Sequence, residues 1–325
     1  MSNLKDKFAA ANVIAMWEQE LHANRPVIPG HVWHWSQMNP LIGEAADAVN
    51  MDDAERRVLI LRNPGLTGPA AGAAPNLSVN LQVLMPGEKA RPHRHTMHAL
   101  RFVLEGTGAV TVVEGKSCPM LPGDLVLTPG WTWHEHVNNT PDRSVWVDAL
   151  DVPIHGFLDN RVFEPGPTRG MTAVPPDEVF AAGLAPEKPT TGYAYSPMFR
   201  YPWDGASKAL DAVQPDADGA RRLRYTNPVT GGAVLSTIDC YLLGLSKGAE
   251  TTAHRSNSNT VCVVVEGEGQ SRVGDDLISW GPKDVFALPH GQWNSHKATS
   301  AGAKIFQITD RELFRRLDFL RDETR

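Results

Sequence analysis

One sequence pattern occurs twice in this chain, and only the first copy keeps all of its histidines. The first copy has histidine at four matched positions, which are His93, His95, His134 and His136. The second copy has His254, Ser256, Asn294 and His296 at the corresponding places, 161 residues further on for the first pair and 160 for the second. The repeat predicts two similar folded units, of which only the first has the residues for a metal site.

Each copy consists of short apolar runs that are separated by glycine-containing turns. The first copy includes SVNLQVLMPG, LRFVLEGTG, AVTVVEG, GDLVLTPGW and SVWVDALDVP, and the second includes NTVCVVVEGEGQ, DDLISWG, DVFALP and KIFQITD. Runs of this length, rich in Val, Leu and Thr, are typical of antiparallel strands in a sandwich or barrel. We therefore expect an all-β-dominated fold, with helices only at the two ends of the chain.

The repeat also predicts how the chain is divided. We expect an N-terminal helical and extended segment over 1–76, a metal-binding strand unit over 77–155, a Pro/Gly-rich linker over 156–232, a metal-free strand unit over 233–309, and a C-terminal helix over 310–325. A chain of 325 residues is long enough for two domains of ordinary size.

Composition excludes several classes of partner. The formal net charge is −6 and there are no runs of Lys and Arg, so we expect no nucleic acid as partner. No apolar stretch is long enough for a membrane span, and the N-terminus lacks the apolar core of a signal peptide. The cysteines Cys118, Cys240 and Cys262 lie in strand-like runs, and we expect them to be reduced and buried. The expected compartment is the cytoplasm.

The histidines of the first copy have the spacing of metal ligands. His93 and His95 are two residues apart on a predicted strand, so both imidazoles leave the same face, and His134 arrives from a later strand. Three neutral imidazoles without a compulsory fourth ligand suit a divalent metal that keeps open positions. A packing role without metal is the alternative.

These segments resemble a known family. The spacings G-x5-H-x-H from Gly87 and G-x5-P-x4-H-x3-N from Gly123 are the two cupin motifs. With PHRHTMHALRFVLEGTG, PGDLVLTPGWTWHEH and RYTNPVTGG, the chain closely resembles gentisate 1,2-dioxygenases and their salicylate and 1-hydroxy-2-naphthoate relatives. The resemblance runs from HVWHW to RYTNPVTGGAVLSTIDCYLLGL. It implies a bicupin of two jelly-roll barrels, a homotetramer, and extradiol-type ring cleavage by O₂ at Fe(II) bound to His93, His95 and His134.

The first copy lacks a carboxylate that many cupins use as a ligand, because Ala99 and Leu100 stand where that Glu would be. Iron held by three neutral ligands keeps its double positive charge, which favours a bidentate anionic substrate such as an ortho-hydroxy aromatic acid. The family resemblance makes gentisate the first candidate. The chain reads HRHTMHALRF where the family commonly has HRHTQSALRF, and it has Ser78 and Asn80 at the pocket entrance, so a 5-substituted salicylate or a hydroxynaphthoate stays open.

Strand parity places further residues near the metal. Counting by two along the strand from His93 and His95 reaches Arg101, so its side chain should face the same interior. There it would hold the substrate carboxylate, or else pair with Asp148. Gln82 is expected to line the pocket or to have a structural polar role. Asp148 is expected to orient an arginine or histidine, or simply to end a strand.

His136 has the parity of His134, and the family resemblance implies a histidine here that stabilises charge or moves a proton near the bound oxygen. The second copy keeps His296 at this place, so a structural role is equally open. Other candidates are weaker. His98 has the opposite parity and is expected on the outer face or at an interface, and Arg56, Arg57 and Arg62 are expected to be solvated, although one of them could reach the pocket.

Two other functions compete with ring cleavage. A non-catalytic or storage-type bicupin could bind a small ligand, but such a role places no demand on His93, His95 and His134. A metal-dependent decarboxylase or isomerase on the same scaffold would usually require the missing Glu. The ring-cleaving dioxygenase is therefore the favoured hypothesis.

Overall fold

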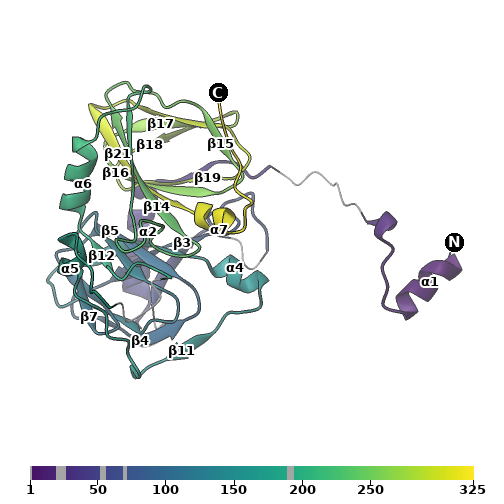
Figure 1. Cartoon of the computed structure of the whole chain (residues 1–325), viewed down its shortest axis with the longest axis horizontal. Coiled ribbons are helices and arrows are strands. Elements are labelled where there is room, and N and C mark those ends of the chain that lie inside the picture. The colour runs from purple at the N-terminus through teal and green to yellow at the C-terminus, as the bar shows by residue number, and fades with distance from the viewer. Residues whose placement is uncertain (1, 20–26, 52–55, 69–71, 189–193) are drawn as a thin grey trace.

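The computed structural model describes residues 2–19, 27–51, 56–68, 72–188 and 194–325. It contains two β-sandwiches, the first in the lower half of Figure 1 and the second in the upper half. Each sandwich has one six-stranded and one five-stranded sheet, with no strand shared between the two sheets. The all-β-dominated jelly-roll fold is thus confirmed, although the sheets face each other as open layers and do not close into barrels.

The first sandwich contains most of the first repeat. Its six-stranded sheet has the order β12 (Arg200–Tyr201), β8 (Leu125–Thr128), β5 (Ala99–Glu105), β10 (Ser144–Leu150), β3 (Ser78–Leu84), β2 (Arg57–Leu61). Its five-stranded sheet has the order β11 (Phe163–Pro165), β4 (Lys89–His95), β9 (His134–Val137), β6 (Ala109–Val113), β7 (Lys116–Met120).

The second sandwich repeats this arrangement strand for strand. Its six-stranded sheet has the order β1 (His31–Trp33), β19 (Val285–Leu288), β16 (Thr260–Glu266), β21 (Gly302–Thr309), β14 (Asp239–Ser246), β13 (Ala220–Arg224). The five-stranded sheet, taken from the matching edge, is β22 (Asp322–Thr324), β15 (His254–Ser256), β20 (Asn294–Ala298), β17 (Gly269–Val273), β18 (Asp276–Trp280). The duplication therefore includes the edge strands, which the sequence repeat alone does not reveal.

Those edge strands come from segments that were expected to lie outside the two units. Strands β1 and β2 belong to the segment 1–76, and the linker 156–232 contributes β11 and β12 to the first sandwich and β13 to the second. The C-terminal helix predicted over 310–325 was wrong in extent, because α7 covers only Arg311–Arg316. Asp318 then adopts a left-handed φ of 57°, which ends the helix and allows the chain to finish as β22. The division of the chain into domains stays a prediction.

Helices occupy the periphery. They are α1 (Ser2–Ala10), η1 (Met16–Glu18), α2 (Trp35–Ala48), α4 (Val152–Phe157), α5 (Asp177–Ala181), α6 (Trp203–Ala212) and α7. Figure 1 shows α1 and η1 away from the sandwiches, α6 beside the second sandwich, and α4 and α7 together on the opposite side. Among the described residues, no helix has the length and apolar character to cross a membrane.

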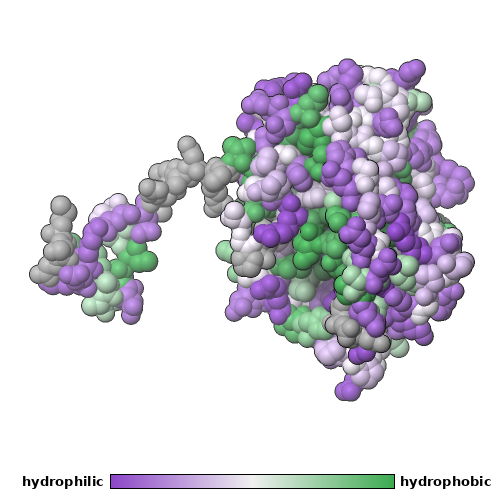
Figure 2. All heavy atoms as spheres, turned by 180° about the vertical axis from the view of Figure 1, so that it is seen from behind, coloured by the Kyte–Doolittle hydropathy of each residue, from purple (hydrophilic) through white to green (hydrophobic). Residues whose placement is uncertain are grey.

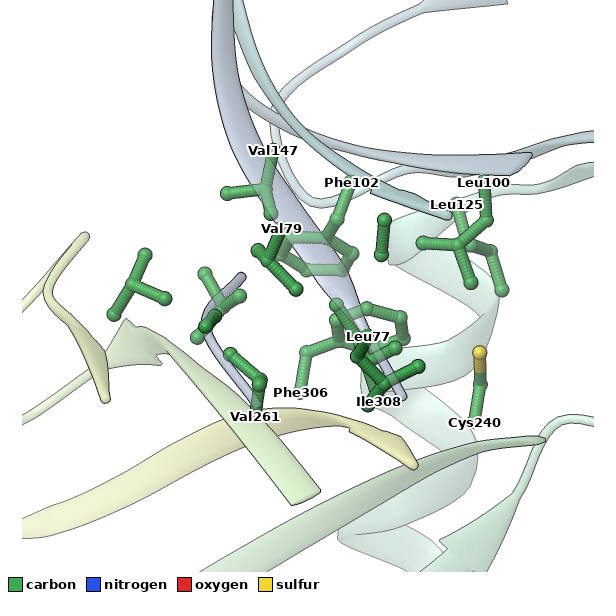
Figure 3. Packing of buried hydrophobic residues seen from close by; sticks show 14 of the residues in the cluster. Leu77, Val79, Leu100, Phe102, Leu125, Val147, Cys240, Val261, Phe306 and Ile308 are labelled. Carbon is green, nitrogen blue, oxygen red and sulfur yellow. The ribbon is translucent and has the colours of Figure 1, made fainter. Parts of the chain in front are cut away.

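The largest core lies between the two six-stranded sheets. Alternate residues of β3, β5 and β10 point away from the interior of their own sandwich and pack against β14, β16 and β21 of the other (Figure 3). The rings of Phe102 and Phe306 stack at the centre, with centroids 4.1 Å apart and planes 9° apart. Because these strands are buried on both faces, their other alternate residues must face the sandwich interior.

This shared core predicts a large effect of a single truncation. Phe306 is fully buried, so Phe306→Ala removes a stacked ring and should lower the free energy of unfolding by about 3–5 kcal/mol. Denaturant unfolding would measure the loss, with Phe157→Ala as control because Phe157 is 90% exposed. A loss below about 1 kcal/mol would mean that the two sandwiches do not depend on a common core.

Candidate metal centre

The three predicted ligand histidines meet inside the first sandwich. His93 and His95 lie on β4, and His134 begins β9, where it pairs in register with His93. All three are buried, and one ring nitrogen from each lies within 4.8 Å of the other two. The spacing of two residues on one strand and the pairing with its neighbour together bring the imidazoles to one point.

Backbone hydrogen bonds orient all three rings in the same way. A carbonyl oxygen can only accept, so Nδ1 of each histidine must carry the proton and donate it. His93 Nδ1 donates to the Arg91 carbonyl at 2.8 Å, and His95 Nδ1 donates to Met97 at 2.9 Å. His134 Nδ1 donates to the Thr132 carbonyl at 2.9 Å. Each Nε2 therefore carries no proton and presents a lone pair, as a metal ligand requires, and that of His93 accepts a hydrogen bond from Arg56 Nη1 at 3.1 Å.

The electrostatic surroundings keep these imidazoles neutral. Burial, followed by the charge of Arg56, lowers the pKa of His93 to about 3, and burial lowers the pKa of His95 to about 4. The pKa of His134 is also lowered well below its usual range by burial. His134 Nε2 is buried without a hydrogen-bond partner, so a ligand atom is available that nothing in the described protein satisfies. This donor set fits a divalent metal ion.

A cavity of about 380 Å³ reaches the cluster at His95. Its wall is formed by the inward-facing residues of β2, β3, β5 and β10, together with His95. The lining residues are Arg56, Val58, Ile60, Ser78, Asn80, Gln82, His95, Arg101, Asp148, Leu150 and Val152. Two guanidinium groups and one carboxylate share this space, so an added anion would balance the charge.

Arg101 and Asp148 lie side by side in the cavity wall. Their strands place them opposite each other in register, and Arg101 Nε is 3.3 Å from Asp148 Oδ1. Neither atom makes a well-aligned hydrogen bond, whereas Arg101 Nη1 donates to Thr128 Oγ1 at 2.7 Å. Burial raises the pKa of Asp148, and the Arg101 charge opposes that shift. The arginine thus has the acid as neighbour and keeps donor capacity for a bound anion.

Gln82 and His136 each present an unsatisfied nitrogen inside the sandwich. Gln82 Nε2 is buried without a partner and belongs to the cavity wall. His136 lies two residues beyond His134, and its ring centroid is 6.0 Å from the His134 ring. Its Nδ1 is hydrogen-bonded to Thr111 Oγ1 at 2.8 Å, and its Nε2 has no partner among the described residues. Both residues therefore have capacity for a ligand.

The three N-terminal arginines differ in their surroundings. Arg56 reaches the site, because its Nη1 lies 3.1 Å from His93 Nε2, so the expectation of a solvated charge was wrong for it. The same expectation was wrong for Arg57, which is buried, donates to the Ala46 carbonyl and pairs with Glu88. Arg62 is exposed, as expected. Parity could not have identified Arg56, because it precedes the first residue of β2.

One further neighbour of the histidines escaped the sequence analysis. Phe163 on β11 stacks on the His93 ring, with centroids 5.2 Å apart and planes 21° apart. It lies in the segment predicted to be linker, where no periodicity marks a strand of three residues. The partly buried His98 lies where the two sandwiches meet, hydrogen-bonded to Ser236 of the second one, which agrees with the interface alternative.

The matching place in the second sandwich has lost its ligands. His254 Nε2 lies 3.4 Å from an oxygen of Asp322, and Ser256 Oγ is hydrogen-bonded to Ser258 Oγ at 2.8 Å. The surrounding cavity measures about 290 Å³. Among the described residues, the cluster of potential metal ligands is formed by His93, His95 and His134 alone.

Comparison with known proteins points to one group of enzymes. Residues 80–152 match a family model described as a cupin domain. The chain is 34% identical to gentisate 1,2 dioxygenase 1 of Aquipseudomonas alcaligenes, over 97% of this chain and 94% of that protein. It is 34% identical to the 5-aminosalicylate 1,2-dioxygenase of a Comamonas species, over 98% of this chain and 89% of that protein. A mutant salicylate 1,2-dioxygenase of Pseudoaminobacter salicylatoxidans, solved with gentisate, has a TM-score of 0.91 at 32% identity and covers 99% of this chain and 94% of that chain.

The difference between the two sandwiches predicts the metal stoichiometry. Metal analysis of reconstituted protein should give one ion per chain, because within the described parts of the chain it is the first sandwich alone that brings three imidazoles together. His134→Ala should abolish binding, whereas His254→Ala, the matched change in the second sandwich, should leave the content unchanged. Two ions per chain, or loss of metal from a folded His254→Ala variant, would contradict the single-site arrangement.

Proposed function

Because this chain belongs to the family of gentisate and salicylate 1,2-dioxygenases, we propose that it uses Fe(II) and O₂ to open a 2-hydroxy aromatic carboxylate between the carboxyl-bearing and hydroxyl-bearing carbons. The chain is a ring-cleaving dioxygenase. The observation that carries the proposal is the position of three unprotonated Nε2 atoms beside a cavity that contains Arg56 and Arg101.

We assign the iron to His93, His95 and His134. Ferrous iron would supply open coordination positions and the electron density that O₂ needs for attack on the ring. Three neutral imidazoles leave its double positive charge uncompensated, because no carboxylate of the described residues joins the cluster. An anionic substrate is therefore preferred over a neutral phenol.

The cavity supports an ortho-hydroxy acid as substrate. Arg101 would bind the carboxylate through donors that Thr128 and Asp148 leave available. Arg56 would add a second positive charge on the side of His93. Gln82 Nε2 would donate a hydrogen bond, since it has no other buried partner. Asp148 would orient Arg101 and would not itself contact the anion.

The polar residues at the pocket entrance, Ser78 and Asn80, favour a substrate with a polar group on its ring. Ser78 Oγ donates to Asn80 Oδ1 at 3.2 Å, so the Asn80 amide nitrogen stays available as a donor toward the cavity. A polar group on the ring could accept from this nitrogen. We therefore rank gentisate or a 5-substituted salicylate with a hydroxyl, amino or nitro group ahead of unsubstituted salicylate or a hydroxynaphthoate as the proposed substrate.

His136 would stabilise negative charge that develops on an oxygen of the substrate during the reaction. Its pKa is lowered well below the usual range by burial, so the ring is neutral and its Nε2 can exchange one proton. The bond from Nδ1 to Thr111 fixes the ring in the interior. We propose that His136 stabilises the charge on an oxygen of the substrate, or moves a proton at that atom, through Nε2.

We also propose a homo-oligomer, a tetramer by the family resemblance, located in the cytoplasm. Figure 2 shows apolar side chains on the N-terminal helices and across the middle of the face seen from behind. Ile14, Met16 and Trp17 are each more than two-thirds exposed, which is unusual for a monomer. All three cysteines are buried and free, as suits a reducing compartment.

The metal and reaction class can be tested by oxygen uptake. Anaerobic loading with ferrous salt and ascorbate should give O₂ consumption with gentisate, and the ferric protein should bind the acid without turnover. Zinc has no redox chemistry, so zinc-loaded protein should be inactive. Comparing gentisate, 5-aminosalicylate, salicylate and 1-hydroxy-2-naphthoate would rank the substrates. Turnover with zinc alone would exclude dioxygenase chemistry.

Arg101 can be tested as the carboxylate partner. Arg101→Lys keeps the charge but loses the planar fork, so kcat/KM should fall by the equivalent of about 1.5–3 kcal/mol, with little change in metal content. The exposed Arg62→Lys is the matched control and should behave like the parent. If Arg101 mainly supports Asp148, Arg101→Lys and Asp148→Asn should both lower stability, and their effects should not be additive. An unchanged kcat/KM in Arg101→Lys would assign the anion to another group, with Arg56 next.

A further inference from the structure

His98 forms a hydrogen-bonded link between the two sandwiches. The Gly130 backbone N–H donates to His98 Nδ1 at 2.9 Å, so Nδ1 carries no proton. The proton of this neutral ring is therefore on Nε2, which donates to Ser236 Oγ at 2.7 Å. Burial lowers the pKa of His98, which favours this neutral form. One imidazole thus joins a loop of the first sandwich to a loop of the second.

The Gly130 loop, residues 129–133, determines where a metal ligand lies. The Trp131 N–H donates to the His95 carbonyl at 2.6 Å, and the Thr132 carbonyl accepts from His134 Nδ1 at 2.9 Å. Any displacement of this loop therefore moves the His134 imidazole relative to His95. The loop connects β8 with β9 and has no strand partner of its own.

The Gly130 loop is also under conformational constraint. Trp131 adopts a left-handed φ of 64°, which a side chain other than glycine rarely takes. A Cβ added to Gly130 would lie 2.5 Å from the Thr96 carbonyl oxygen, so the loop is pressed closely against the end of β4. A strained and crowded loop needs external contacts to hold its position, and His98 provides one of them.

The second sandwich has a matching contact at the equivalent place. By the repeat, Asn259 corresponds to His98, His290 to Gly130, and Asn76 to Thr237, the neighbour of Ser236. The Asn259 side-chain oxygen accepts from the His290 N–H at 3.1 Å, as His98 Nδ1 accepts from Gly130. Asn259 Nδ2 then donates to Asp310 Oδ2 at 2.6 Å, and this oxygen also accepts from Asn76 of the N-terminal half at 2.9 Å.

Each half therefore holds the other half's loop through a residue that precedes its first central strand. In the second sandwich the contact passes through a buried carboxylate. In the first, the longer imidazole reaches Ser236 directly, and the adjacent Thr237 Oγ1 donates to Asp151 Oδ2 at 2.5 Å. Only one of these two reciprocal contacts adjoins a candidate metal ligand, and that contact is the one made by histidine.

We propose that His98 is a positioning residue through which the metal-free sandwich, by way of Ser236, fixes the Gly130 loop and hence the His134 ligand. This inference rests on the proposed metal site, but it concerns retention of the metal and not the reaction. It gives the second sandwich a function although it has lost its own ligands. His98 touches neither the metal nor the substrate.

The test compares Ser236→Ala with Asn76→Ala, which removes the bond from the N-terminal half to Asp310 in the matching network of the metal-free half. Both variants of the full chain are loaded with Co(II) or Fe(II) and challenged with a chelator. Ser236→Ala should release metal roughly three- to tenfold faster than the parent, the factor expected for one lost neutral hydrogen bond. It should also raise hydrogen exchange in peptides that cover residues 129–134. Asn76→Ala should release metal at the parent rate even where it lowers thermal stability.

A second set of variants separates the two bonds of the imidazole. The amide of His98→Asn can accept from Gly130, as Asn259 does in the second sandwich, whereas the amide of His98→Gln can replace Nε2 toward Ser236. Both should retain metal better than His98→Ala. Parent-like metal release in His98→Ala and Ser236→Ala would overturn the proposal, as would equal acceleration by Asn76→Ala. Because no turnover is measured, failure here is distinguishable from failure of the dioxygenase assignment.

Discussion

The structure depends on three central strands that are buried on both faces. One face of β3, β5 and β10 forms the core shared with the second sandwich, where Phe102 stacks on Phe306. The opposite face must therefore carry whatever lines the interior of the first sandwich. That interior includes Gln82, Arg101 and Asp148, and the strands tolerate these polar residues because their outward faces supply the hydrophobic stabilisation.

The first sandwich concentrates unsatisfied polar atoms where a ligand would bind. Gln82 Nε2, Arg101 Nε and His134 Nε2 are buried without hydrogen-bond partners. Each such atom costs about 1–3 kcal/mol when nothing satisfies it. The interior is therefore complementary to a metal ion and an anion, which would provide partners for these atoms. No buried unpaired side-chain atom of the corresponding cavity is found among the described residues of the second sandwich, in keeping with its missing ligands.

The sequence was sufficient to predict the features that follow from the alternation of side chains along a strand. A spacing of two residues placed His93 and His95 on one face, and the same parity brought Arg101 to the cavity wall. It was not sufficient for contacts made by irregular or very short segments. Arg56 precedes a strand and Phe163 lies on a strand of three residues, so neither belongs to a recognisable pattern. The tie between His98 and Ser236 joins residues 138 positions apart and depends on how the sandwiches pack.

The order of the edge strands has a consequence for whether the two halves of the chain can be separated. Strand β1 precedes the whole first sandwich, yet it pairs with β19 of the second, while β2, the next strand, returns to the first. The chain is therefore interlaced, and a cut between the repeats would leave the second half without one of its edges and expose the apolar faces of both. The two halves can therefore differ in chemistry, but each sandwich is completed by a strand from the other side of such a cut, β1 for the second and β12 for the first.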